Sequence, residues 1–165
     1  MSIRATLKGL CDAGKLQPYR PRGTRQPARR RIFLPPRFAG NDFVDAAFTR
    51  FVLGDRVYKG FLDRLEPPRD EIWEIRVTAP RPQWRVLGRF AEPDTFVATG
   101  CFARDRLGRK GSDEWEAAIA DCVAQWAALF PGLDPHTAPA IDRYVTENCD
   151  DFALNPPRRR KPPQP

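Results

Sequence analysis

Hydrophobic and polar residues alternate with a period of two in residues 71–78 and 83–90, near the middle of the chain, and residues 95–102 form a third segment rich in β-forming residues. In the first segment, Trp73, Ile75 and Val77 share one side, a pattern typical of a half-buried strand. Prolines and acidic residues between the segments supply turns. Because the connections are short, the pattern predicts an antiparallel meander and not a parallel sheet.

The second of these segments has one apolar and one basic side. Trp84, Val86 and Phe90 fall on one face, and Arg85, Leu87 and Arg89 fall on the other. A sheet face with arginines at regular spacing is a candidate platform for a polyanion. The alternative interpretation, without any binding function, is that these arginines form the solvated face of a half-buried sheet and pair with a neighbouring glutamate.

Helical periodicity flanks the strands on both sides. Asn41 is the predicted N-cap of a helix whose apolar residues follow at helical spacing: Phe43, Val44, Ala47, Phe48, Phe51 and Val52. Val57, Phe61 and Leu65 continue this period, which predicts two short helices or one broken helix. Ser112 is predicted to cap a further helix with an acidic first turn. The predicted fold class is α+β, a small antiparallel sheet packed against helices, with four tryptophans expected in the core: Trp73, Trp84, Trp115 and Trp126.

The chain is predicted to have one domain with appendages. Residues 1–40 are rich in arginine, proline and glycine and are expected to form a largely flexible arm, apart from a short helix at 2–13 and an edge strand at 32–34. The remaining boundaries are an α+β domain over 41–130, an appended segment over 131–155 with a weak helix at 138–152, and a basic disordered tail over 156–165.

Charge is concentrated at the two ends of the chain. The net charge is +7, of which residues 1–40 carry +9 and residues 158–161 carry +4, so the rest of the chain is acidic at 7 − 9 − 4 = −6. Basic ends of this kind are either solvated tails or nucleic-acid-binding arms. We expect both ends to be mobile in the free protein and to increase RNA affinity electrostatically.

The cysteine and histidine content argues against a metal site. Four cysteines are widely spaced, without a Cys-x-x-Cys pair, and there is one histidine. No apolar run approaches the roughly 20 residues of a membrane span, and the N-terminus lacks a signal-peptide core. The expectation is a cytoplasmic protein with free thiols, no cofactor, no metal and no membrane partner.

Three motifs, in this order and spacing, carry a resemblance to a known family: IWEIRV at 72–77, QWRVLGRF at 83–90 and GCFARDRLGRKGSDEWEAAI at 100–119. Residues 55–128, roughly, resemble the toxin ribonucleases of the RelE/HigB superfamily, and most closely its phage-derived branch. The resemblance implies a toxin of a toxin–antitoxin system, an endoribonuclease that cleaves mRNA, free or on the ribosome. Its implied partners are mRNA, the ribosome and a cognate antitoxin protein.

The resemblance also implies which residues act. Arg76 and Arg85 would bind the scissile phosphate from the sheet, while Arg104, Arg109 and Lys110 would close over it from the loop, mostly in place of the family's lysines. Further RNA contacts are expected from six arginines: Arg81, Arg89, Arg106, Arg158, Arg159 and Arg160. The tyrosine or histidine usual near the end of the family's domain has no evident counterpart here. The nearest candidates, His136 and Tyr144, lie in the appended segment.

Two other functions remain open at this point. One is a non-catalytic nucleic-acid-binding protein of a phage or mobile element that retains the same scaffold. The other is a regulatory partner whose basic arms bind a protein or nucleic acid. Growth and mRNA integrity after expression in a bacterial cell would distinguish a toxin from both.

Overall fold

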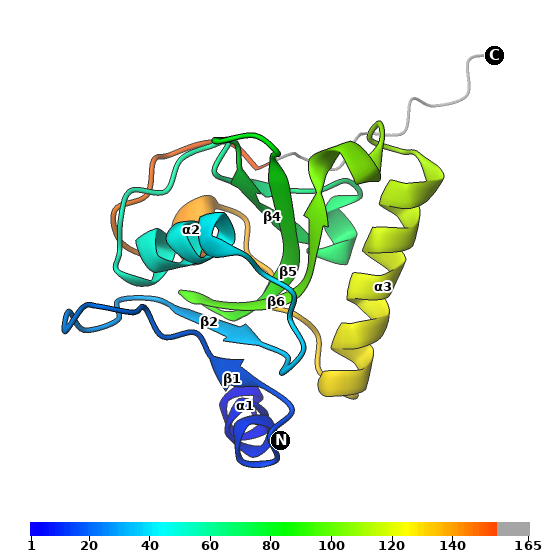
Figure 1. Ribbon diagram of the computed structural model, residues 1–165. Helices are drawn as coiled ribbons and strands as arrows, with labels where there is room; N and C mark the ends of the chain where they lie inside the picture. Colours follow the sequence, from blue (N-terminus) through cyan, green and yellow to red (C-terminus); the bar gives the residue numbers. More distant parts are fainter. Residues whose placement is uncertain (155–165) are drawn as a thin grey trace.

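The computed structural model describes residues 1–154. These residues form a six-stranded sheet of order β1-β2-β6-β5-β4-β3 and three α-helices (Figure 1). The strands are β1 (Gln17–Pro18), β2 (Arg31–Leu34), β3 (Leu62–Arg64), β4 (Trp73–Val77), β5 (Trp84–Glu92) and β6 (Thr95–Ala103). The helices are α1 (Ile3–Asp12), α2 (Asp42–Val52) and α3 (Asp113–Leu129), with short 3₁₀ turns at Pro68–Asp70, Arg104–Leu107 and Ile141–Arg143.

The predicted meander is confirmed as β4, β5 and β6, each antiparallel to the next. The fold class is α+β, but the sheet as a whole is mixed, because β2 pairs with β6 in parallel. The register places Arg76 of β4 directly opposite Arg85 of β5. This cross-strand pair matters for the site described below.

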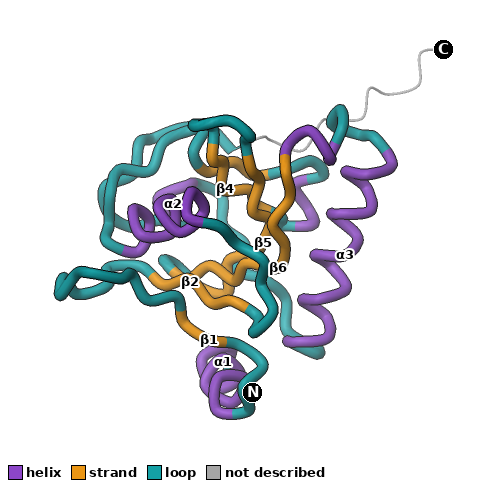
Figure 2. The backbone as a smooth tube through the Cα atoms, viewed as in Figure 1, coloured by secondary structure: helices purple, strands orange, loops and turns teal. Residues whose placement is uncertain are grey.

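Both faces of the sheet are covered, as Figure 1 and Figure 2 show with α2 on one side and α3 on the other. Apolar residues of β4 and β5 join α2 in one large core, to which Ile141, Tyr144 and Val145 of the C-terminal segment also contribute. On the other face, α3 packs against two smaller clusters, one of which it shares with α1. The face that holds Arg85 and Arg89 is therefore not a solvated surface, and both arginines are buried.

Local signals account for the helices that the sequence predicted. The Asn41 side chain accepts hydrogen bonds from two backbone amides at the start of α2, and the Ser112 hydroxyl accepts one at the start of α3. Trp115 and Trp126 lie on α3 and are both buried, as expected. Trp73 is buried in the larger core, and Trp84 packs at its margin.

The flexible arm predicted for residues 1–40 needs correction, because this segment supplies α1, β1 and β2 to the fold. Arg30 shows why. Its guanidinium is buried and donates hydrogen bonds to the backbone carbonyls of Phe51, Asp55 and Glu147. These carbonyls bury an arginine that the composition of residues 1–40 had predicted to be exposed to solvent.

Two predicted helices are also wrong. Residues 57–65 form a bridge at Val57 and the edge strand β3 instead of a helix. The spacing of Val57, Phe61 and Leu65 matched a helical period by coincidence, since all three are buried through tertiary packing. The weak helix expected at 138–152 is reduced to the 3₁₀ turn Ile141–Arg143. The predicted tail over 156–165 lies outside the described residues.

Gly88 lies where β5 and β6 approach closely, beside a register shift in their pairing. A Cβ atom there would lie 2.3 Å from the carbonyl oxygen of Val97, which is backbone and cannot rotate away. We expect Gly88→Ala to lower the free energy of unfolding by about 1–3 kcal/mol. The matched control is Gly9→Ala in α1, where nothing lies within 4 Å, and which should raise stability by roughly 0.5–1 kcal/mol. Urea denaturation of both variants tests this, and equal effects would contradict it.

Candidate functional site

Two of the predicted catalytic arginines share one buried carboxylate. Arg76 and Arg85 face each other across β4 and β5, and Glu74, two residues before Arg76, is fully buried beneath them. Arg76 Nε donates to Glu74 Oε1 at 2.7 Å, and Arg85 Nε lies 3.5 Å from Glu74 Oε2. Like charges directly opposite each other in a sheet are destabilising. Glu74 is the group that offsets this repulsion.

More charges converge on the same point from other elements. Lys110 Nζ, in the loop before α3, lies 3.8 Å from Glu74 Oε1, and Asp63 Oδ2 on β3 lies 3.3 Å from Arg76 Nε. These ion pairs join three cations to two carboxylates. The positive charge of Arg104 also lowers the pKa of the Arg85 guanidinium. We call Arg76, Arg85, Arg104 and Lys110 the basic cluster.

Exposure differs within the basic cluster. The Arg85 side chain is 9% exposed, whereas those of Arg76 and Lys110 are 26% and 61% exposed. Burial lowers the pKa of the Arg85 guanidinium, and the carboxylate of Glu74 acts in the opposite direction. Arg104 donates to the carbonyl of Gly108 at 2.6 Å and lies over the Trp115 ring. Arg76, Arg104 and Lys110 are therefore the members that a ligand can touch, and Arg85 acts from behind them.

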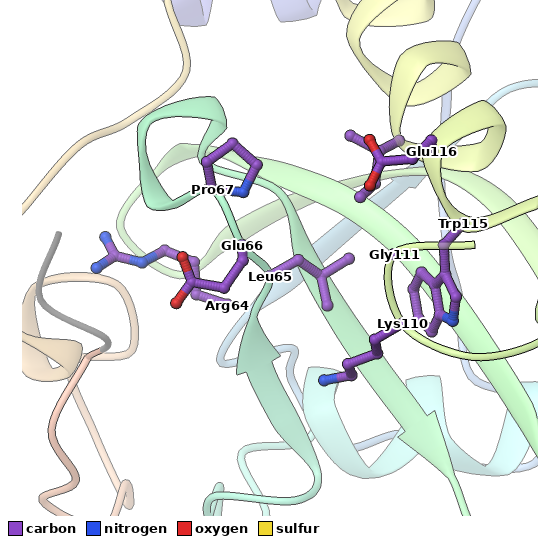
Figure 3. A pocket seen from close by; sticks show the side chains of 9 residues that line it. Arg64, Leu65, Glu66, Pro67, Lys110, Gly111, Trp115 and Glu116 are labelled. Atoms are coloured by element: carbon purple, nitrogen blue, oxygen red, sulfur yellow. The ribbon is translucent and has the colours of Figure 1, made fainter. Parts of the chain in front are cut away.

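Two cavities adjoin the basic cluster. The smaller, of about 140 Å³, is lined by Arg76, Lys110, Asp63 and Lys59, and residues 152–154 close one side of it. The larger, of about 540 Å³, lies between residues 64–67 and the start of α3. Lys110 and Arg64 line both cavities, so the two are adjacent. Figure 3 shows the larger one, with Leu65, Pro67 and Trp115 among its walls and Lys110 at its edge.

The other predicted site residues are not brought into this cluster. Arg109, Arg106 and Arg81 are exposed. Arg89 is buried on the same strand as Arg85 but lies beside Trp126, under the C-terminal half of α3. Arg158, Arg159 and Arg160 lie outside the described residues.

Tyr144 and His136, the proton-transfer candidates, belong to a different network. The Tyr144 hydroxyl donates to Glu71 Oε2 at 2.7 Å in the core, and the His136 ring packs edge-on against the Tyr144 ring. Arg64 Nη1 pairs with the other oxygen of Glu71 at 3.0 Å. Burial, followed by the hydrogen bond to Glu71, raises the pKa of Tyr144 to about 12. This tyrosine stabilises the core and does not face the basic cluster.

The raised pKa of Tyr144 predicts a loss of stability at high pH. The folded protein holds this proton more tightly than the unfolded chain, so the stabilisation is present below pH 10 and is lost as the pH rises toward 12. We expect the Tyr144 contribution to the free energy of unfolding to fall by on the order of 2 kcal/mol across that interval. Denaturant titrations at several pH values measure it. Tyr144→Phe should flatten the slope, and a slope that survives this change would contradict the prediction.

Sequence analysis missed Asp63 and Lys59, because residues 57–65 were interpreted as a helix. No local signal was available, because Leu62, Asp63, Arg64 and Leu65 do not alternate with the period of two that predicts a strand. Glu74 was recognised as a partner for the arginines, but its complete burial was not expected.

Within residues 1–154, no three histidine, cysteine or acidic residues gather in a way that would hold a metal ion. The helices of this part of the chain are all too short or too polar to cross a membrane. The four cysteines are free thiols, and burial raises the pKa of Cys101 and Cys149 to about 11. Comparison of the chain with protein-family models, curated proteins and solved structures found no match.

Proposed function

We propose that the protein is an endoribonuclease of the RelE/HigB type that binds the RNA backbone at the basic cluster. The observation that carries the proposal is the convergence of Arg76, Arg85 and Lys110 on one buried carboxylate, with more positive than negative charge at the mouth of a small cavity. A phosphodiester is an anion suited to that excess charge. Arginine forks match phosphate oxygens in geometry as well as in charge.

The cavities fit the proposed substrate in size. A phosphate group in the smaller cavity would contact Arg76 and Lys110, the two members of the basic cluster that line it. The adjoining cavity of about 540 Å³ has the volume and the mixed apolar and polar walls of a small-ligand site, and it would take the neighbouring nucleoside. The shared residue Lys110 would then lie between base and phosphate.

The proposed reaction needs no metal. The 2′-hydroxyl oxygen of the RNA forms a bond to the adjacent phosphorus, and the bond from phosphorus to the 5′-oxygen breaks. The hydroxyl proton leaves to a base, and the departing oxygen gains a proton. Negative charge builds on the phosphate oxygens in the transition state, where preorganised cations stabilise it most.

One observation favours the second candidate, a non-catalytic nucleic-acid-binding protein. No histidine or tyrosine is among the residues that contact the basic cluster in the described structure, and Tyr144 and His136 are engaged elsewhere. Binding needs only the cations, whereas rapid cleavage also needs proton transfer.

Incubating the purified protein with a defined mRNA, with and without ribosomes, separates the two functions. The proposed function predicts cleavage products that end in a cyclic or 3′-phosphate, together with growth arrest and mRNA loss on expression in bacteria. Salt-sensitive RNA binding with intact RNA would establish the alternative. Neither binding nor cleavage would reject both.

A further inference from the structure

Arg89 is a buried cation that pairs with no carboxylate in the part of the chain that the structure describes. The residue is 7% exposed, and its Nη2 donates to the backbone carbonyl of Asp70 at 2.5 Å. Its Nε is buried and has no hydrogen-bond partner. Within residues 1–154, no ion pair joins Arg89 to a carboxylate, and its guanidinium carbon lies 5.8 Å from the centre of the Trp126 ring.

The other two buried arginines of the described residues are better satisfied. Arg85 is paired with Glu74, and Arg30 donates to three carbonyl oxygens. A buried charge is costly unless it is paired and hydrogen-bonded. Arg89 departs from this rule, which points to a partner outside the folded chain.

The space for such a partner lies beside α3. A cavity of about 630 Å³ is lined by Arg89 and by apolar side chains of α3 and the loop that follows it: Val123, Trp126, Phe130 and Leu133. Val123 is one of the few large hydrophobic residues of the described chain that are exposed, at 36%. The cavity volume lies within the roughly 300–1,000 Å³ typical of small-molecule sites.

Three acidic residues also line this cavity, and two of them are already engaged. Glu71 is held by Arg64 and Tyr144, and the Asp70 carboxylate lies 3.8 Å from Arg69. Asp134, in the loop after α3, disfavours a second negative charge on a ligand. The site thus fits a compound with a single carboxylate.

We propose that Arg89 and this cavity form a binding site for a small carboxylic acid with an apolar body. Its carboxylate would pair with the Arg89 guanidinium, and its aromatic or aliphatic group would lie against Trp126 and Val123. Arginine pairs with carboxylates through parallel, charge-assisted hydrogen bonds. The site is separate from the basic cluster, so it stands whether or not the protein cleaves RNA.

The test uses phenylacetate as the probe and phenylacetamide as its neutral counterpart. Each is titrated to tens of millimolar into the ¹⁵N-labelled full chain, with the indole signal of Trp126 and the Nε–H signal of Arg89 as readouts. We expect saturable shifts with phenylacetate and at least about tenfold weaker binding of the amide, because it lacks the charge. Arg89→Lys should weaken phenylacetate binding, since a point charge cannot reproduce the fork.

Val123→Trp provides a second variant, at an exposed position where folding is not at risk. The larger ring fills the cavity and should abolish the phenylacetate shifts while leaving the rest of the spectrum unchanged. Equal responses to acid and amide, no response to either, or binding that survives Val123→Trp would each overturn the proposal. A tripeptide ending in phenylalanine distinguishes the source of the carboxylate: binding of the peptide without binding of phenylacetate would overturn the assignment to a small molecule.

Discussion

Replacing Glu74 by alanine is expected to lower the free energy of unfolding by about 3–5 kcal/mol, the usual cost of removing one partner from a buried ion pair. The glutamate is fully buried and lies within ion-pair distance of Arg76, Arg85 and Lys110. Without it, the two cross-strand arginines repel each other with no carboxylate between them, and only Asp63 remains near Arg76. Urea denaturation monitored by tryptophan fluorescence gives the free energy.

Asp105→Ala is the control for this variant. Asp105 is an exposed acid in the loop next to the basic cluster, so its removal changes the net charge equally without opening a buried pair. We expect its effect to stay within about 0.5 kcal/mol of zero. A Glu74→Ala protein that loses less than about 1 kcal/mol would mean that water reaches the two arginines and screens them.

For the proposed RNA cleavage, Arg76→Gln is expected to lower the rate by about 10²–10³, the usual effect of losing one preorganised donor to a developing negative charge. Arg76 is the arginine of the basic cluster that lines the small cavity, and its side chain is partly exposed. Because the interaction strengthens as charge builds up, turnover should fall more than RNA affinity. Single-turnover cleavage of a defined mRNA separates the two quantities.

The charge-matched control is Arg81→Gln. Arg81 is exposed in the turn between β4 and β5, so its replacement by glutamine removes the same charge from the same region. If the basic cluster acts by position, Arg81→Gln should change the cleavage rate only slightly, mainly at low salt. Equal losses in the two variants would show that general positive charge drives binding, and would favour the non-catalytic alternative.

The sequence was sufficient to predict the elements that depend on interactions between residues close together in the chain. α2 and α3 begin at side-chain caps that can be recognised from a few residues, and β4 to β6 follow one another through short turns. The parallel pairing of β2 with β6 was out of reach, since it joins residues 31–33 to residues 95–97. No local pattern in β2 indicates that partner. The same applies to Arg30, whose acceptors come from α2, the loop after it and the C-terminal segment.

In the candidate site too, contacts between neighbouring strands were predicted and contacts between distant segments were not. Arg76 and Arg85 were expected together because of the family resemblance, and the register of β4 with β5 places them opposite each other. Asp63 was missed, since it reaches the site through the edge strand β3. The burial of Arg85 and Arg89 could not be foreseen either. It depends on which side of the sheet α3 covers, and alternation along a strand does not determine that side.

The pairing of β2 with β6 has a consequence for the order in which the chain folds during its own synthesis. Translation adds roughly 5–20 residues per second, so β2 waits several seconds for the residues of β6 to leave the exit tunnel. The carbonyl of Glu147, which accepts from Arg30, arrives later still. Until then, the arginine-rich N-terminal segment is held by few of its final contacts and projects from the nascent chain. We therefore expect it to dock last, after the meander and both of its covering helices have formed.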